Sequence, residues 1–247
     1  RRFIEISMEI IKTKITSSKG GLAAAIHFPE TRTRRLAILC PGYLDSKDYK
    51  HLVGLAEALS KQGYAVVRFD PTGTWESEGE ISDYTTTQYL EDIKNVLEYM
   101  LQQADYKYVL LGGHSRGGMV SILYAARDSR ISLVLGIMPS SRRSVTWKRR
   151  EDWERDGFSI SQRDVPGKTE KKEFRVPYSH AKDIDQYGVV EDVKNYPIIF
   201  LPGVAGSELY CGNNNAWPGW LPQRATGGYF GEMEMDEKGK SKCNIVP

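Results

Sequence analysis

The sequence predicts an α/β domain with a doubly wound, mostly parallel sheet. Strand-like and helix-like segments alternate four times over residues 36–138, a pattern typical of a parallel sheet with helices on both faces. The strand-like segments are short unbroken apolar runs, as expected for strands that are buried on both faces. Hydrophobic residues make up 40% of the 247 residues and charged residues 27%, so a core of ordinary size can form.

Each element follows from the composition and the apolar period of its segment. The predicted strands cover residues 3–15, 22–28, 36–40, 64–70, 108–113 and 131–138. The predicted helices cover residues 48–61, 85–103 and 117–126. A cap insertion is expected at about 140–185, where charged residues dominate and either helices or a loop would fit the composition. Ligands of such sheets bind at the carboxyl ends of the strands, so the loops there are the place to look for chemistry.

The loop after the strand at 108–113 carries the sharpest motif of the chain. Gly113-His114-Ser115-Arg116-Gly117 is a G-x-S-x-G sequence between a strand and a helix, the context of a nucleophile elbow. Such a turn exposes the serine hydroxyl, the two glycines avoid side-chain collisions, and the N–H of Arg116 can face an oxyanion. A glycine-rich phosphate loop is the competing interpretation, but no Lys-Ser/Thr pair follows.

The loop after the strand at 36–40 supports this interpretation. Pro41-Gly42-Tyr43 follows that strand, and the backbone N–H of Tyr43 can be the second oxyanion donor. An ordinary strand-to-helix turn is the alternative. The loop at 70–79, DPTGTWESEG, lies at the same sheet edge and is expected to be structural or to line the pocket.

These motifs resemble the α/β-hydrolase superfamily, and within it the serine aminopeptidase and monoglyceride-lipase-like esterases. The resemblance covers roughly residues 20–195 and implies an α/β-hydrolase domain over 1–195 with a cap. The elbow matches fully, whereas Pro41 stands where the family has histidine. The resemblance implies a serine esterase with Ser115 as nucleophile and the N–H groups of Tyr43 and Arg116 as oxyanion hole.

The rest of a catalytic triad does not follow from the sequence. In this superfamily the acid and then the histidine come after the serine, but the only later histidine is His180. Because His180 precedes the last clear strand, we expect a surface or cap histidine there. At the position of the family acid stands Gly206, and Glu208 is a weak substitute. The C-terminal part of the fold is therefore expected to be incomplete, with the histidine and acid outside these 247 residues.

The segment 196–247 resembles the opening strand and loop of another hydrolase domain. Leu201-Pro202-Gly203 follows an apolar strand, as Cys40-Pro41-Gly42 does, with serine four residues after each glycine. With the Ala-Trp-Pro of 216–218, the segment resembles the start of lecithin:cholesterol acyltransferase-like lipases. The sequence predicts either the start of a second lipase-like module or a diverged end of the first domain.

Together these observations predict a serine hydrolase of carboxylic esters with a small acyl or ester substrate, inactive or nearly so in this form. The alternative is a non-catalytic binding module on the same fold. The sequence carries no dinucleotide fingerprint and no His/Cys/carboxylate cluster with metal spacing, so neither a cofactor nor a metal is expected. A net charge of +2 argues against nucleic acid as a partner, and no apolar run is long enough for a transmembrane segment.

Overall fold

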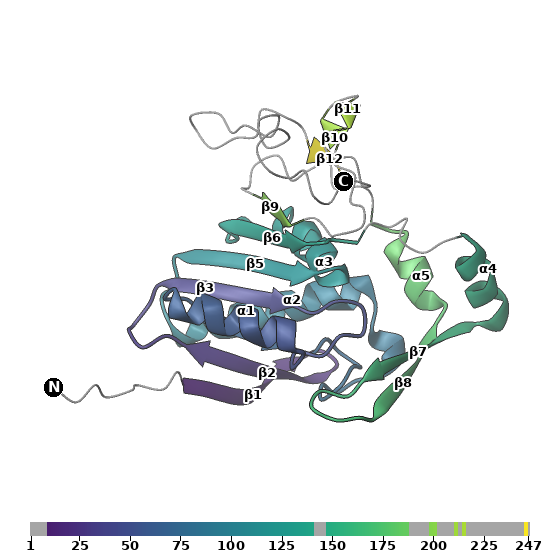
Figure 1. Cartoon of the computed structure of the whole chain (residues 1–247), viewed down its shortest axis with the longest axis horizontal. Helices are drawn as coiled ribbons and strands as arrows, with labels where there is room; N and C mark the ends of the chain where they lie inside the picture. The colour runs from purple at the N-terminus through teal and green to yellow at the C-terminus, as the bar shows by residue number, and fades with distance from the viewer. Residues whose placement is uncertain are drawn as a thin grey trace.

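A seven-stranded sheet with the order β1-β2-β4-β3-β5-β6-β9 forms the centre of the fold (Figure 1). The computed structural model describes residues 9–140, 147–187, 198–201, 210–211, 214–215 and 245–246. The strands of the sheet are β1 (Glu9–Ser17), β2 (Gly20–Phe28), β3 (Arg35–Cys40), β4 (Ala65–Phe69), β5 (Tyr108–His114), β6 (Leu133–Ile137) and β9 (Ile198–Leu201).

The pairing confirms the predicted mostly parallel sheet. Strand β3 pairs in parallel with both β4 and β5, and β6 pairs in parallel with β5 and β9. The antiparallel pairings of this sheet are β1 with β2 and β2 with β4, at one edge. The carboxyl ends of β3, β5 and β6 therefore meet at one edge of the sheet, where the motif loops begin.

Helices cover both faces of the sheet, as the alternation of elements predicts. They are α1 (Lys50–Lys61), α2 (Thr86–Gln103) and α3 (Arg116–Ala125). The pleat of β3 divides its buried side chains, so Ala37 and Leu39 pack with Leu52 of α1. The alternate side chains of β3 join the larger core with residues of α2 and α3. Burial on both faces is the reason that this strand reads as an unbroken apolar run.

An insert lies between β6 and β9, beyond the carboxyl ends of the parallel strands (Figure 1). It consists of α4 (Trp147–Asp156), β7 (Phe158–Asp164), β8 (Lys171–Pro177) and α5 (Ser179–Ile184). Strands β7 and β8 form an antiparallel hairpin, which the composition of the insert did not indicate. The apolar alternation of the hairpin is short, with Phe158 and Ile160 in β7 and Phe174 and Val176 in β8, and it lies within a charged segment. Phe174 and Val176 nevertheless join the main core.

The C-terminal segment enters the sheet through β9, whose Ile198 is paired with Val134 of β6. The short strands β10 (Tyr210–Cys211), β11 (Asn214–Asn215) and β12 (Ile245–Val246) form a separate antiparallel sheet. A short 3-10 helix, η1 (Ile81–Asp83), precedes α2. The likeness of 196–247 to a second lipase-like module falls mainly outside the described residues and stays a prediction. Within the described part of the chain, we find no helix with the length and apolarity that a bilayer crossing needs.

Candidate active site

The turn between β5 and α3 holds Ser115 in a strained backbone conformation. Its φ is 51° and its ψ is −115°, a region that costs a non-glycine residue about 1–3 kcal/mol. A Cβ on Gly117 would lie 2.6 Å from the Pro41 carbonyl oxygen and even closer to that of Cys40. A Cβ on Gly113 would likewise collide with the carbonyl of Cys40. The two glycines thus allow the turn to pack against the end of β3.

Helix α3 begins immediately after Ser115, at Arg116. The first N–H groups of a helix have no intrahelical acceptor, and they lie at its positive end. Neither the N–H of Arg116 nor that of Tyr43 donates a hydrogen bond to another described residue. Both backbone groups are therefore available to an oxyanion near Ser115.

A cavity of about 710 Å³ brings the predicted residues together, because Ser115, Tyr43 and Arg116 all line it. This volume is in the range typical of small-molecule sites. The insert supplies the opposite wall. Its lining residues come from α4, β7 and α5: Asp152, Trp153, Asp156, Phe158, Ser159, Ile160, Ser161, His180 and Ile184.

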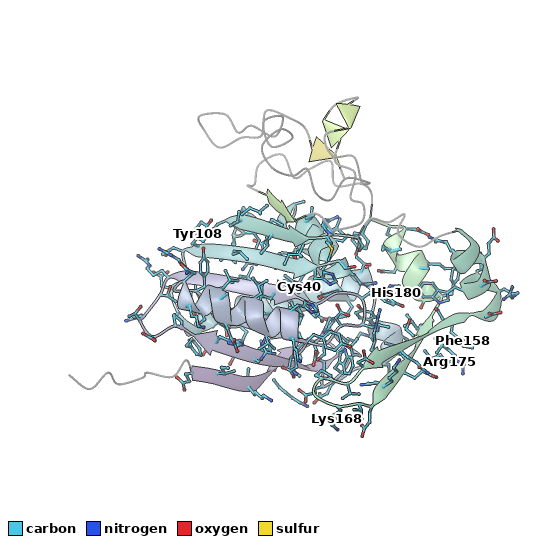
Figure 2. The ribbon with its side chains drawn as sticks, viewed as in Figure 1. Cys40, Tyr108, Phe158, Lys168, Arg175 and His180 are labelled. Carbon is cyan, nitrogen blue, oxygen red and sulfur yellow. The ribbon has the colours of Figure 1, made fainter. Side chains whose placement is uncertain are left out.

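His180 is buried in this wall at 5% exposure and lies in the insert, so of the two expected positions, surface or cap, it takes the cap position (Figure 2). It lies on α5, where its ring stacks on Trp153 at 5.6 Å between centroids. Its Nδ1 lies 2.6 Å from the Tyr84 carbonyl oxygen and must donate to it. The Nε2 atom is then the acceptor, and it accepts from the guanidinium of Arg116. Burial and the charge of Arg116 hold the pKa of His180 well below its ordinary value.

The Arg116 side chain is also buried, at 3% exposure. Its guanidinium lies 4.6 Å from the centre of the Tyr84 ring and 5.9 Å from that of Tyr43. Among the described residues it forms no ion pair with a carboxylate. The guanidinium of Arg116 therefore contacts the rings of Tyr84 and Tyr43 and the imidazole of His180 and has no carboxylate partner among the described residues.

The four histidines of the chain all lie in the described part, and only His180 lines the cavity with Ser115. His27 is on β2, where its Nε2 accepts from Arg68. His114 and His51 lie near each other, with ring centroids 5.2 Å apart. Because Arg116 occupies the Nε2 of His180, this geometry leaves Ser115 without an imidazole acceptor. Gly206 and Glu208, the positions considered for the acid, lie outside the described residues.

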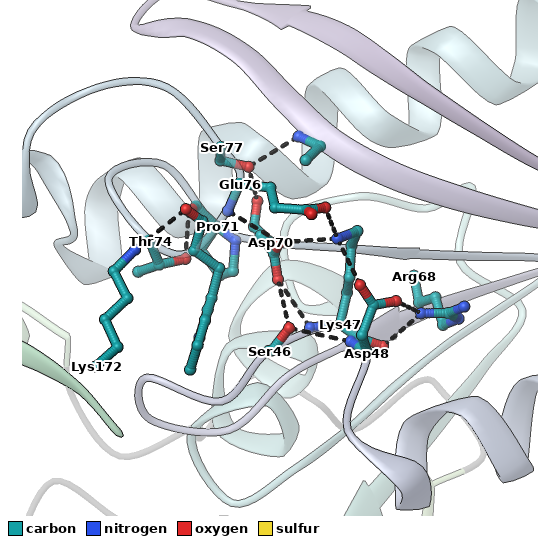
Figure 3. Close-up of polar contacts among 12 residues, drawn as sticks. Ser46, Lys47, Asp48, Arg68, Asp70, Pro71, Thr74, Glu76, Ser77 and Lys172 are labelled. Atoms are coloured by element: carbon teal, nitrogen blue, oxygen red, sulfur yellow. Dashed lines mark hydrogen bonds and ion pairs between the residues drawn. The ribbon is translucent and has the colours of Figure 1, made fainter. Parts of the chain in front are cut away.

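The loops that follow β3 and β4 are joined by a buried ionic network (Figure 3). The ammonium of Lys47 lies 3.1 Å from Asp70, and it also contacts Asp48 and Glu76. Asp70 in turn accepts from the backbone N–H of Lys47 at 2.8 Å. The 70–79 loop is therefore structural here, since it holds the loop that carries Tyr43.

A second cluster, formed by Asp45, His51 and His114, was missed by the sequence analysis. Asp45 and His51 are six residues apart, but His114 lies on a strand much later in the chain, and no spacing signal of a metal motif connects the three. The fold brings one ligand atom of each within 4.8 Å of the others. This proximity in space arises from the fold and is not visible as ligand spacing along the chain.

A family model described as alpha/beta hydrolase fold matches residues 37–158, about half of the chain. Mouse mitochondrial palmitoyl-protein thioesterase ABHD10 is 24% identical over 153 residues, covering 61% of this chain and 50% of the relative. An uncharacterized 31.7 kDa protein of Escherichia coli is 32% identical over 127 residues, covering 49% and 44%. The chain thus spans about half the length of these curated relatives.

Solved structures share the fold at low identity. Est1E from Butyrivibrio proteoclasticus, solved with ferulic acid, has a TM-score of 0.59 and 21% identity, with 76% of this chain and 77% of that chain covered. GrgF from Penicillium sp. sh18 has a TM-score of 0.63 and 18% identity, with 79% of each chain covered. Taken with the sheet order and the family model, these likenesses show that the chain has the α/β-hydrolase fold.

Proposed function

We propose that this protein is a serine hydrolase of carboxylic esters in which Ser115 attacks the carbonyl carbon. The observation that carries the proposal is the strained conformation of Ser115 at the start of α3, inside a cavity of small-molecule size. The Ser115 Oγ forms a bond to the acyl carbon, and the alcohol leaves with a proton. The N–H groups of Tyr43 and Arg116 stabilise the negative oxygen of the tetrahedral intermediate.

The walls of the cavity support an acyl substrate. Met119 of α3, with Phe158, Ile160 and Ile184 of the insert, offers an apolar surface to an acyl chain. Acyl thioesters belong to the same proposal, because thiolates are good leaving groups and the ABHD10 relative is named a thioesterase. A small acyl or ester molecule is therefore the proposed partner.

We further propose that the 247-residue chain turns over slowly, because no imidazole is free to take the proton of Ser115. A serine hydroxyl is a weak nucleophile without a base. His180 faces the same cavity, but its Nε2 accepts from Arg116 and its Nδ1 donates to Tyr84. The same observation favours the second candidate, a binding module that holds acyl ligands without hydrolysing them.

A fluorophosphonate probe tests the nucleophile directly, since attack by Oγ on phosphorus displaces fluoride and leaves a stable adduct. We expect one adduct, located at Ser115 by mass spectrometry, at a rate well below that of a complete serine hydrolase. Ser115→Ala removes the adduct. Ser140→Ala is the matched control, because Ser140 lines the same cavity and lies outside the elbow.

Two outcomes would contradict parts of this proposal. Absence of an adduct, with acyl ligands still bound, would refute the nucleophile and support the binding module. Fast turnover of a p-nitrophenyl ester that falls at least tenfold in His180→Gln would identify His180 as the base and refute slow turnover. A rate of Ser115 labelling that is unchanged in His180→Gln supports the proposal of slow turnover.

A further inference from the structure

Asp45, His51 and His114 meet behind the elbow, outside the cavity that Ser115 lines. Asp45 lies in the loop after β3, His51 is on α1, and His114 is the last residue of β5. None of the three lines the cavity. The cluster therefore belongs to the α1 side of the sheet edge, and the proposed ester hydrolysis does not use it.

One distance in the cluster matches the separation of two ligands on a small metal ion. The His114 Nδ1 lies 3.4 Å from Asp45 Oδ2. Two ligands at a tetrahedral zinc ion, each bonded at about 2.1 Å, are separated by about 3.4 Å. One ligand atom of His51 completes a set of three within 4.8 Å, and rotation of its exposed side chain can shorten the remaining distances.

One polar atom of the cluster lacks a hydrogen-bond partner. The Nδ1 of His114 is buried and has no hydrogen-bond partner among the described residues. A buried polar atom of this kind calls for an explanation such as an ion or water. Gly42 also keeps the space open, because a Cβ there would lie 2.5 Å from Asp45 Oδ2 and 3.1 Å from His114 Nδ1.

We propose that Asp45, His51 and His114 bind one divalent transition-metal ion of the zinc class. Two imidazoles and one carboxylate are ligands that zinc prefers, and three protein ligands leave a position for water. Such an ion would connect the loop that carries Tyr43 to the residue before Ser115. It would therefore hold the two proposed oxyanion donors in position without contacting the substrate.

Metal binding by the full chain tests the proposal without relying on its activity. Titration calorimetry with Zn²⁺ is expected to give one ion per chain, and Co²⁺ is expected to give the visible absorption of a tetrahedral site. His51→Ala should weaken binding at least tenfold, and because His51 is exposed this variant keeps the fold. Asp45→Asn should weaken it as well. Lys50→Ala, an exposed neighbour on α1, is the matched control and should bind normally.

Cysteine thiolates are the competing zinc ligands in this chain, so a Cys211→Ser/Cys243→Ser variant is measured in parallel. Unchanged one-to-one binding in that variant supports the proposed site. Three results would each overturn the proposal. They are loss of Zn²⁺ binding in the double cysteine variant, equal Zn²⁺ affinity of His51→Ala and the wild-type chain, and no binding at millimolar Zn²⁺. A rise in Tm with Zn²⁺ that EDTA reverses and His51→Ala abolishes supports the coupling of the loop to the elbow.

Discussion

Replacing Lys47 by methionine is expected to destabilise the protein strongly, because it leaves a charge buried alone. The side chain of Lys47 is 1% exposed, and that of its partner Asp70 is 0% exposed. Burial alone would lower the pKa of Lys47, but Asp70, Glu76 and Asp48 outweigh it and raise that pKa, so the ammonium stays charged. Methionine has a similar length and keeps the packing, but it cannot donate to Asp70.

The magnitude follows from the exposure of each partner. Glu76 is 65% exposed, and water replaces its contact with Lys47 at little cost. In Lys47→Met, Asp70 still accepts a hydrogen bond from the backbone N–H of residue 47 at 2.8 Å and a longer one from Glu76 N at 3.4 Å. Removing one partner of a buried ion pair costs about 3–5 kcal/mol of stability. Because Asp70 keeps two backbone donors, we expect Lys47→Met to cost about 3 kcal/mol, the lower end of this range. Asp70→Asn added to Lys47→Met should recover about 2 kcal/mol, because it removes the stranded charge.

Urea unfolding at pH 7.5, followed by circular dichroism, measures both effects. With a slope of about 3 kcal/mol per M, a loss of 3 kcal/mol lowers the midpoint by about 1 M. Lys94→Met is the matched control, because Lys94 and Glu91 are an exposed pair 3.3 Å apart. It should cost less than about 0.5 kcal/mol. A loss below about 1 kcal/mol for Lys47→Met, or additive effects in the double variant, would refute the reasoning.

Three further predictions concern the elbow, the buried Cys40 thiol and the buried His180 imidazole. Gly117→Ala places a Cβ 2.6 Å from the Pro41 carbonyl oxygen. We therefore expect this variant to have a lower Tm and to form no fluorophosphonate adduct. Normal labelling of Ser115 would contradict the described elbow. Burial raises the pKa of the Cys40 thiol to about 12, so Cys40 should resist iodoacetamide at pH 8 until the protein is unfolded, as read by peptide mass spectrometry. Because the pKa of His180 is lowered in the fold, the unfolded chain binds more protons below about pH 6.5 and stability falls there. Between pH 7.5 and 5.5 the wild-type chain should lose about 1.4 kcal/mol more stability than His180→Asn in urea unfolding, and equal losses would mean that His180 titrates normally.

The sequence predicted the sheet and the elbow for local reasons. The strands around β3 and β5 are apolar on both faces, and the elbow packs its strand end, serine and glycines into five consecutive residues, 113–117. Such features depend on neighbours along the chain, so a single sequence carries them. The insert hairpin was not predicted, because the apolar alternation of β7 and β8 covers only two residues in each strand and lies within a charged segment.

The sequence by itself determined the fold class, the position of Ser115 at a strand-to-helix turn, and the scarcity of histidines after it. Only the tertiary structure decided that Arg116 occupies the Nε2 of His180, and that Asp45, His51 and His114 meet behind the elbow. Each of these two sites includes residues far apart in the chain, and they meet because parallel strands carry their loops to one edge of the sheet. Periodicity along the chain records which face of an element is buried, but it does not record which distant side chain the element meets there.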